Sequence, residues 1–412
     1  MSGAERMVKE VVERLQERYS FIIVTSRLRR NLPQFVEVEH RRTLQRAGAS
    51  ERRRFDLDDS RIKIVRIGFG WKFDKFLYPI LAPFYALRYR PKIVHAIMES
   101  YAGIALLVYS YLAKLSKPLI LNSQFLILTL RRRSNLDALC SEQERAKEGD
   151  SISHKNVFTI LTLQSGDLDL PEKQARIPRW LWKRIHCAPN LIVSIGNSMA
   201  ERARKLGAKS VRVIPNGVNL TEVRPPNIRR SDLRQHHIVC VARLSPEKGI
   251  EYLIEAMPFV IAQYPDAELV LVGNGALREK LQATSYKLQA HVEFRGTLSH
   301  EKTLEEMATS DILVLPSLAE GMGIVLVEAQ ALGVPVIGTN VGGIPDVIEH
   351  ERTGLLVPPH DPRAIAQAVI RLFHDHELRE RMVVEAETRL LKFDWQKIAE
   401  EYRNIYDQVS SV

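Results

Sequence analysis

Short apolar runs alternate along the chain with longer amphipathic stretches, and this alternation predicts strands and helices in turn. In the first half, the apolar and alternating runs predict strands at residues 21–25, 62–67, 93–96, 118–121, 190–195 and 211–214. Apolar positions at helical spacing predict helices at residues 3–18, 101–115 and 198–206.

The second half repeats this alternation more regularly. Strands are predicted at residues 237–242, 268–272, 291–295, 312–315, 334–338 and 355–357. Helices are predicted from residue 249, before Gly333, and at residues 363–373, 378–389 and 394–409. Strands that alternate with helices form parallel βαβ units, so the chain is predicted to be an α/β protein with two doubly wound parallel sheets in tandem.

A break between the two series divides the chain. Pro215-Asn216-Gly217 punctuates the first series, and residues 224–232, with two consecutive prolines, have the composition of a linker. We therefore expect a first domain at residues 1–222 and a second at residues 223–393, with a cleft between them where a small molecule can bind. Residues 394–412 are expected to form a C-terminal helix that packs back on the first domain.

Composition narrows the class of protein. With 45% hydrophobic and 26% charged residues, the chain has the balance of a soluble globular protein. Its 3 cysteines show no CxxC spacing, which indicates neither a disulfide framework nor a zinc site and favours a reducing compartment. The most apolar segment, residues 101–113, is too short to span a bilayer, and acidic residues interrupt the first turns of the chain. We therefore expect no membrane-spanning segment and no signal peptide.

Charge is distributed unevenly along the chain. Residues 1–225 carry 40 lysines and arginines against 22 acidic residues, whereas residues 226–412 carry 19 against 27. The positive first half indicates an anionic partner, for which a membrane surface, a phosphorylated acceptor and nucleic acid are the candidates. No recognition motif accompanies the charge, so we expect no nucleic-acid partner. A solvated basic face is the structural alternative.

One stretch of the second half, Leu315 to Gly333, combines a strand end, a glycine loop and an apolar helix. Gly321-Met322-Gly323 leads into the helix, whose free backbone N–H groups and positive dipole end suit a phosphate or a sugar oxygen. Glu320 lies in the loop, and Glu328 lies in the helix, where a carboxylate can accept hydrogen bonds from two ribose hydroxyls. The alternative is a surface loop with two solvated acids.

Four further loops follow predicted strands of the second sheet, at the edge where doubly wound folds bind ligands. In the first, Arg243 and Lys248 are spaced to clamp a pyrophosphate and to stabilise the charge that builds up as it leaves. The second, Gly273-Asn274-Gly275, allows another backbone to approach closely. The third, at Thr297-Leu298, can flank a base, and the fourth covers residues 341–346.

These loops closely resemble those of the family 4 retaining glycosyltransferases, which have the GT-B fold of two Rossmann-like domains. The resemblance is strong from about Val211 to Phe373, through VIPNGVN, VARLSPEKGIEYLIEA, LVLVGNGALREKL, VEFRGTLSHE, LPSLAEGMGIVLVEAQALG and VGGIPDVI. The family includes glycogen synthases, sucrose-phosphate synthases and phosphatidylinositol mannosyltransferases. The resemblance implies a nucleotide-sugar donor as co-substrate, with no cofactor and no metal.

The resemblance also implies roles for individual residues. Arg243 and Lys248 match the family's ligands of the diphosphate, and Glu328 matches its ligand of the ribose. Glu320 matches the glutamate that lies, with the backbone after it, against the donor sugar. Arg243, Lys248 and Glu320 are therefore the expected catalytic residues. The other expected donor-binding residues are Gly321, Met322, Gly323, Gly273, Asn274, Gly275, Thr297 and Leu298.

The resemblance is looser in the first domain, where the family binds the acceptor. Three residues are expected on the acceptor or sugar side. Gly3 lies in a stretch like the family's G-G-A-E-R-V-V, His95 ends a strand like P-D-V-V-H-A, and Gln124 stands where a histidine facing the donor sugar is common. His95 can equally be a histidine with satisfied hydrogen bonds at a strand end. In the family a central strand precedes the G-G-A-E-R stretch, and here that first strand is expected to be missing.

The resemblance implies a retaining glycosyltransferase that moves a sugar from a UDP- or GDP-sugar to an acceptor hydroxyl, such as that of a lipid-linked or cell-envelope glycan. Peripheral contact with an anionic membrane is expected through the basic first domain and the aromatic-rich segment at residues 69–90. As an alternative, this segment can pack in the core or line the acceptor pocket. The expected location is the cytoplasm, at the inner face of the membrane. Two alternatives stay open: a catalytically impaired nucleotide-binding relative and a GT-B epimerase.

Overall fold

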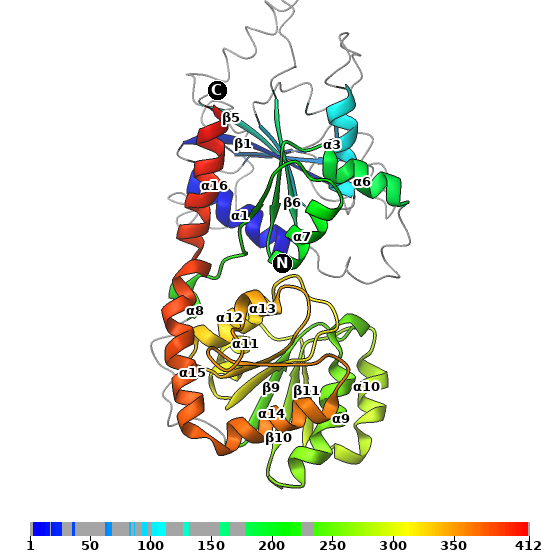
Figure 1. Ribbon diagram of the computed structural model, residues 1–412, viewed down its shortest axis with the longest axis vertical. Helices are drawn as coiled ribbons and strands as arrows, with labels where there is room; N and C mark the ends of the chain where they lie inside the picture. Colours follow the sequence, from blue (N-terminus) through cyan, green and yellow to red (C-terminus); the bar gives the residue numbers. More distant parts are fainter. Residues whose placement is uncertain are drawn as a thin grey trace, which may run out of the picture.

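The computed structural model has two lobes, each built on one β-sheet, that follow one another along its long axis (Figure 1). The structure describes residues 3–16, 18–26, 35–37, 62–67, 82–83, 86, 93–97, 101–112, 127–131, 157–164, 178–223 and 235–410. The first lobe comprises the described residues up to Val223 together with the C-terminal helix, and the second lobe comprises residues 235–394.

The first lobe holds strands β1 to β8 and helices α1, α3, α6, α7 and α8. The strands are β1 (Tyr19–Ser26), β2 (Phe35–Glu37), β3 (Ile62–Ile67), β4 (Ile93–Ile97), β5 (Ile127–Arg131), β6 (Phe158–Leu163), β7 (Leu191–Ser194) and β8 (Val211–Val213). The helices are α1 (Gly3–Leu15), α3 (Tyr101–Leu112), α6 (Arg179–Cys187), α7 (Asn197–Lys205) and α8 (Leu220–Val223). Among the described residues, the strand order is β2-β3-β1-β5-β4-β6-β7-β8.

The centre of this sheet differs from the sequence-based expectation. The position between β1 and β4 is not vacant, because β5 lies there and runs antiparallel to both neighbours. Thr129 of β5 stands opposite Phe21 of β1 and Ile93 of β4. Unpaired N–H and C=O groups along two facing strand edges favour any extended segment that can pair with them, in either direction. The first sheet is therefore mixed rather than wholly parallel.

The second lobe holds a six-stranded sheet with the order β11-β10-β9-β12-β13-β14, and every pair in it is parallel. The strands are β9 (His237–Val241), β10 (Glu268–Val272), β11 (Val292–Gly296), β12 (Ile312–Leu315), β13 (Val336–Thr339) and β14 (Leu355–Val357). The helices are α9 (Ile250–Ile261), α10 (Arg278–Thr284), α11 (His300–Ala308), α12 (Ile324–Ala331), α13 (Ile344–Val347), α14 (Pro362–His374) and α15 (His376–Arg389). Short 3-10 turns are η5 (Pro246–Lys248), η6 (Tyr286–Leu288) and η7 (Leu390–Phe393).

These strands form where apolar runs are bounded by turn residues. All four residues of β12 are buried, as expected of a strand covered by helices on both faces. Helix α14 buries one face, whereas six of the eight residues of α12 are buried. In α14 the N-cap Asp361 accepts a hydrogen bond from the backbone N–H of Ala364 at 3.0 Å, and Pro362 occupies the first turn. The two α/β units expected from the sequence are therefore present.

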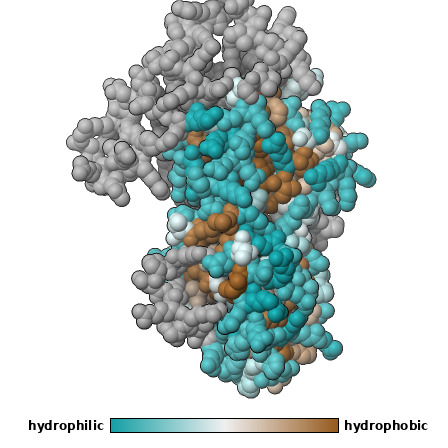
Figure 2. Space-filling model, turned by 60° about the vertical axis from the view of Figure 1, so that its left-hand side comes forward, coloured by the Kyte–Doolittle hydropathy of each residue, from teal (hydrophilic) through white to brown (hydrophobic). Residues whose placement is uncertain are grey.

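The C-terminal helix α16 (Trp395–Ser410) packs against α1 of the first lobe. Its buried residues, which share one side of the helix, are Trp395, Ile398, Ala399, Tyr402, Ile405, Tyr406 and Ser410. In Figure 1, α15 and α16 run along one side of the molecule and pass from the second lobe to the first. On the face shown in Figure 2, hydrophilic residues cover most of the described surface, and hydrophobic residues gather near the junction of the lobes.

Several sequence-based predictions fall outside the described residues. The predicted strand at residues 118–121 and Gln124 both lie outside them. In the aromatic-rich segment at residues 69–90, the structure describes only Ala82, Pro83 and Ala86, none of which is aromatic. No helix among the described residues is long and apolar enough to cross a membrane.

Candidate functional site

The expected donor-side residues lie at the carboxyl edge of the second sheet. The sheet order reverses between β9 and β12, since the chain continues from β9 to β10 and β11 on one side and from β12 to β13 and β14 on the other. Loops diverge at such a reversal and leave a crevice in which doubly wound folds bind ligands. Lys248 follows β9 and Glu320 follows β12, so the two flank this position.

Backbone hydrogen bonds hold the loops after β9, β12 and β13 together. The N–H of Leu318 donates to the carbonyl of Glu247 at 2.8 Å, and the N–H of Gly343 donates to the carbonyl of Glu320 at 3.1 Å. Gly342 has φ 53°, and a Cβ there would lie 2.0 Å from the Glu320 carbonyl oxygen. Only glycine fits so close an approach, so this part of the G-G-I-P-D stretch serves to pack the loop that carries Glu320.

The two basic residues among the expected catalytic residues, Arg243 and Lys248, each pair with a carboxylate. Lys248 Nζ lies 2.6 Å from Glu320 Oε2, and the side chains are only 17% and 14% exposed. Glu320 also accepts hydrogen bonds from the N–H of Gly321 at 3.1 Å and from the hydroxyl of Ser317 at 3.3 Å. The structure therefore brings Lys248 and Glu320, which are 72 residues apart in sequence, into direct contact.

Arg243 lies on the same loop as Lys248 but nearer to solvent. Its Nη2 lies 3.0 Å from Oε1 of Glu247, and its side chain is 66% exposed. An exposed guanidinium can swing from one anionic partner to another at small cost, because solvent screens the ion pair that it leaves. Arg243 thus stands at the rim of the position that Lys248 and Glu320 occupy.

Glu328 lies on α12 of the second lobe, where that lobe contacts the first. The helix begins after Gly323, which adopts φ 79°, a conformation that favours glycine. The Glu328 side chain is 10% exposed, and its Oε1 lies 3.3 Å from Nη1 of Arg6 and 3.9 Å from Nε2 of His300. Burial raises the pKa of Glu328, while the positive charges of His300 and Arg6 act to lower it.

The remaining expected donor-side residues lie on the same edge of the sheet. The N–H of Gly273 donates to the carbonyl of Gly296 at 2.8 Å, which joins the loop of Gly273-Asn274-Gly275 to the loop after β11. Thr297 and Leu298 follow β11 directly and precede α11, whose first residue is His300. The predicted base-flanking loop is therefore next in sequence to a residue that contacts Glu328.

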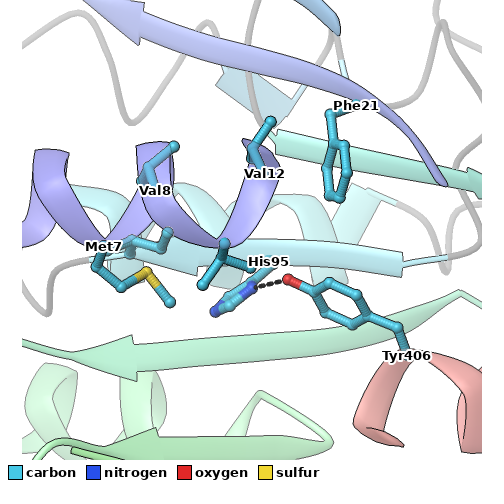
Figure 3. A pocket seen from close by; sticks show the side chains of 8 residues that line it. Met7, Val8, Val12, Phe21, His95 and Tyr406 are labelled. Atoms are coloured by element: carbon cyan, nitrogen blue, oxygen red, sulfur yellow. Dashed lines mark hydrogen bonds between the residues drawn. The ribbon is translucent and has the colours of Figure 1, made fainter. Parts of the chain in front are cut away.

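His95 lies in the interior of the first lobe (Figure 3). Its Nδ1 is 2.8 Å from the hydroxyl of Tyr406, its Nε2 is 2.6 Å from Oγ1 of Thr162, and only 2% of the residue is exposed. Burial lowers the pKa of His95 to about 3, so the ring is neutral. Both ring nitrogens have hydrogen-bond partners. This geometry fits the alternative given for His95, a histidine with satisfied hydrogen bonds at a strand end. The ring joins β4 and β6 to α16.

Two contacts between the lobes involve residues to which the sequence assigns no role. Arg6 of α1, in the helix that Gly3 begins, reaches Glu328. Asp346 of α13 accepts hydrogen bonds from the backbone N–H of Asn197 at 2.7 Å and from its amide nitrogen at 2.6 Å. One local feature of the sequence, Gly196 at the N-cap of α7, relates to the second contact. Glycine has no side chain that could cap the helix, so the carboxylate of Asp346 in the other lobe caps it instead.

Comparison with known proteins identifies the family. The description "Glycosyltransferase Family 4" matches residues 1–222, more than half of the chain. The chain belongs to glycosyltransferase family 4. A second description, "Glycosyl transferases group 1", matches residues 226–389, which include Arg243, Lys248, Glu320 and Glu328.

Curated relatives of this family 4 chain are similar over part of their length. An uncharacterized glycosyltransferase of Methanocaldococcus jannaschii, MJ1607, is 35% identical over 231 residues, which are 52% of this chain and 59% of that protein. The GDP-mannose-dependent alpha-(1-6)-phosphatidylinositol monomannoside mannosyltransferase of Mycobacterium tuberculosis is 33% identical over 41% of this chain and 48% of its own length. The chain thus spans about half the length of the curated relatives it matches.

Solved structures share the fold of this family 4 chain. Sucrose-phosphate synthase from Thermosynechococcus elongatus has a TM-score of 0.67 at 22% identity, over 95% of this chain and 89% of that one. HepE of Anabaena, in complex with UDP and glucose, has a TM-score of 0.63 at 18% identity, over 100% of this chain and 96% of that one. These neighbours are GT-B glycosyltransferases, so the GT-B fold expected from the sequence is confirmed.

Proposed function

We propose that this chain is a retaining glycosyltransferase that transfers a sugar from a nucleotide-sugar donor to an acceptor hydroxyl. The observation that carries the proposal is the contact of Lys248 with Glu320 at the reversal point of the second sheet. Glu328 lies on α12, the helix that follows the Glu320 loop. A lysine beside a glycine loop and a helix start can hold a diphosphate, and buried carboxylates can hold hydroxyls. Family membership supports the same reaction class.

Each donor group has a matching partner in this proposal. Lys248 and Arg243 bind the diphosphate, which replaces the carboxylates that these two cations contact in the absence of donor. Glu328 accepts hydrogen bonds from the ribose hydroxyls. Glu320, released from Lys248, lies with the backbone of Gly321 to Gly323 against the donor sugar. The donor therefore exchanges ion pairs within the protein for ion pairs with its own phosphates.

The proposed reaction breaks one bond and forms another on the same face of the sugar. The acceptor oxygen bonds to the anomeric carbon as the bond from that carbon to the phosphate oxygen breaks. A phosphate oxygen of the leaving diphosphate takes the proton of the acceptor hydroxyl. Lys248 and Arg243 stabilise the negative charge on this leaving group, and closure of the lobes keeps water from the reacting carbon. No metal and no cofactor are required.

A UDP- or GDP-sugar is the proposed donor, with mannosyl and glucosyl transfer as the first cases to test. Relatives include GDP-mannose-dependent phosphatidylinositol monomannoside mannosyltransferases, and the structure of HepE was solved in complex with UDP. For this chain we propose a lipid-linked or cell-envelope glycan as the acceptor.

The donor is testable with a panel of UDP-, GDP- and ADP-sugars in thermal-shift and hydrolysis assays. A ligand at 100 times its Kd stabilises the folded state by about 2.7 kcal/mol, so at least one donor should raise the unfolding midpoint clearly. That same donor should be hydrolysed slowly in water and transferred to an added acceptor. A chain that neither binds nor hydrolyses any of them is not the proposed enzyme.

The same panel separates the two alternatives. A catalytically impaired relative would be stabilised by a nucleotide sugar without hydrolysing it or transferring its sugar. An epimerase would return a free or nucleotide-bound sugar of changed configuration, which chromatography of the products detects. Retention is checked by the anomeric configuration of the glycoside, because an inverting enzyme would give the opposite anomer.

Contact with an anionic membrane is the proposed role of the basic first lobe, with the cytoplasmic face of the membrane as the location. On α6, Trp182, Ile185 and His186 are buried. The exposed side carries Arg179, Trp180, Lys183 and Arg184, and Trp180 is 64% exposed. A tryptophan among cations suits the boundary between headgroups and acyl chains. This surface of α6 supports the proposal.

Reversing the charge of α6 tests this contact. Each lysine or arginine near an anionic surface contributes about 1 kcal/mol, so Lys183→Glu is expected to weaken sedimentation with vesicles that contain phosphatidylserine by at least about tenfold. The matched control is Lys287→Glu on η6 of the second lobe, where Tyr286 is 70% exposed. Equal and weak binding of the parent chain to vesicles with and without anionic lipid would remove the proposal.

A further inference from the structure

An ion pair between the lobes joins Arg6 of α1 to Glu328 of α12. The two residues are 322 positions apart, and Arg6 Nη1 lies 3.3 Å from Glu328 Oε1. Neither side chain is in open solvent, since 20% of Arg6 and 10% of Glu328 are exposed. The roles described above do not use Arg6, although it contacts the carboxylate proposed to bind the ribose.

Glu328 needs a positive neighbour more than a surface carboxylate does. An ionised carboxylate loses much of its hydration on burial, and this cost grows when a partner is removed. Its neighbour in the second lobe, His300, lies 3.9 Å away and is charged only when protonated. A guanidinium is charged at any ordinary pH. Among the described residues, the permanently charged group that pairs with Glu328 is therefore contributed by the first lobe.

We propose that Arg6 is a positioning residue of the donor site, which orients the Glu328 carboxylate from the other lobe for the ribose hydroxyls. The inference rests on the proposed function, in which Glu328 binds the ribose. An ionised carboxylate accepts at about four lone-pair positions. Arg6 and His300 both approach Oε1, and the remaining lone pairs can accept the two hydroxyls. Arg6 and the ribose therefore bind Glu328 together rather than in turn.

The contact makes donor binding depend on the closed arrangement of the lobes. When α1 moves away, Glu328 loses its guanidinium, and its ability to accept from the ribose weakens. The hydrogen bonds of Asn197 with Asp346 join the two lobes at another point of their interface. The lobe expected to bind the acceptor thus acts on the donor site through Arg6.

The test compares a ribonucleoside diphosphate with its 2′,3′-dideoxy analogue. GDP and UDP, each with its analogue, are titrated calorimetrically into the parent chain, Arg6→Gln and Arg6→Lys. We expect Arg6→Gln to weaken binding of the ribonucleotide about tenfold and to leave binding of the dideoxy analogue unchanged. Arg6→Lys, which keeps the charge, should recover most of the loss. The matched control is Arg14→Gln on the same helix, since Arg14 pairs with Glu10 rather than with Glu328.

Each other result overturns a separate part of the argument. An equal loss of affinity for both ligands in Arg6→Gln would make Arg6 a structural residue. Unchanged affinity for both would give Arg6 no role. Tighter binding of the ribonucleotide would mean that Arg6 competes with the ribose for Glu328. A parent chain that binds both ligands equally well would remove the ribose role of Glu328. A parent chain that binds no nucleoside diphosphate would remove the proposed function itself.

Discussion

Replacing Lys248 with alanine is expected to lower turnover of the nucleotide sugar by about two to three orders of magnitude, the usual loss when one charge-stabilising group is removed from an active site. Lys248 is 17% exposed and contacts Glu320, so water replaces its ammonium group poorly. Arg243→Ala should cost less, because Arg243 is 66% exposed and solvent screens its charge. The measurement is the initial rate of donor hydrolysis or transfer.

The fold of these variants must be checked separately from their rates. Glu320 loses its cationic partner in Lys248→Ala, so the unfolding midpoint of this variant should be compared with that of the parent chain. Lys280→Ala is the matched control for a lysine outside the site, because Lys280 is 68% exposed and lies 3.8 Å from Glu251. Near-normal turnover of Lys248→Ala with an intact fold would count against the donor site as a whole.

The stability of the chain is expected to fall as the pH drops below about 6.5, and His95 is one cause. An unfolded histidine takes up a proton near pH 6.5, whereas burial holds the pKa of His95 at about 3 in the folded chain. Between these values the unfolded state binds a proton that the folded state does not. The free energy of unfolding therefore falls by up to about 1.4 kcal/mol per pH unit from this group, and the loss ends near pH 3.

His95→Gln isolates this contribution. Glutamine has no proton to take up in this range, so the variant should be less stable at pH 7 but should lose less stability between pH 7 and pH 5. The unfolding midpoint of the parent chain and of the variant is followed over this range. His374→Gln, on the exposed side of α14, is the control and should keep the parent slope. Parallel slopes for all three chains would show that His95 does not titrate as described.

The second lobe could be predicted closely from the sequence. The predicted strands at residues 268–272, 312–315 and 355–357 coincide with β10, β12 and β14. Such strands are covered by helices on both faces, so they appear as continuous apolar runs between turn residues, which is a strong local signal. The order of strands then follows from short right-handed crossovers. In a parallel sheet, the five glycine- and charge-bearing loops all follow the carboxyl ends of strands, so they lie on one edge of the sheet.

The first lobe was harder to predict. β6 has the apolar, β-branched run FTILTL, a signal that could have been used and was not. β5 has a similar apolar run, ILTLR, but that run does not indicate its position between β1 and β4 or its antiparallel direction. The sequence-based expectation of a missing central strand did not anticipate that another segment would pair there in the opposite direction.

For the candidate site, the residues could be proposed from the sequence, but their partners could not. The sequence points to Arg243, Lys248, Glu320 and Glu328 as residues of one edge, because residue type and position after a strand are local features. It does not indicate that Lys248 pairs with Glu320 or that His95 is enclosed by Tyr406 and Thr162. These partners are set by how loops and helices distant in sequence pack together.

By itself, the sequence determined the α/β architecture and the family, and it supplied the proposed residues of the donor side, since apolar periodicity and loop chemistry are local features of the chain. Only the tertiary structure decided which charges meet. Arg6 and Glu328, like Asn197 and Asp346, come from different lobes, and no local pattern relates them. Their contact depends on how the two lobes pack against each other, and this packing brings Arg6 of the first lobe to the proposed donor site.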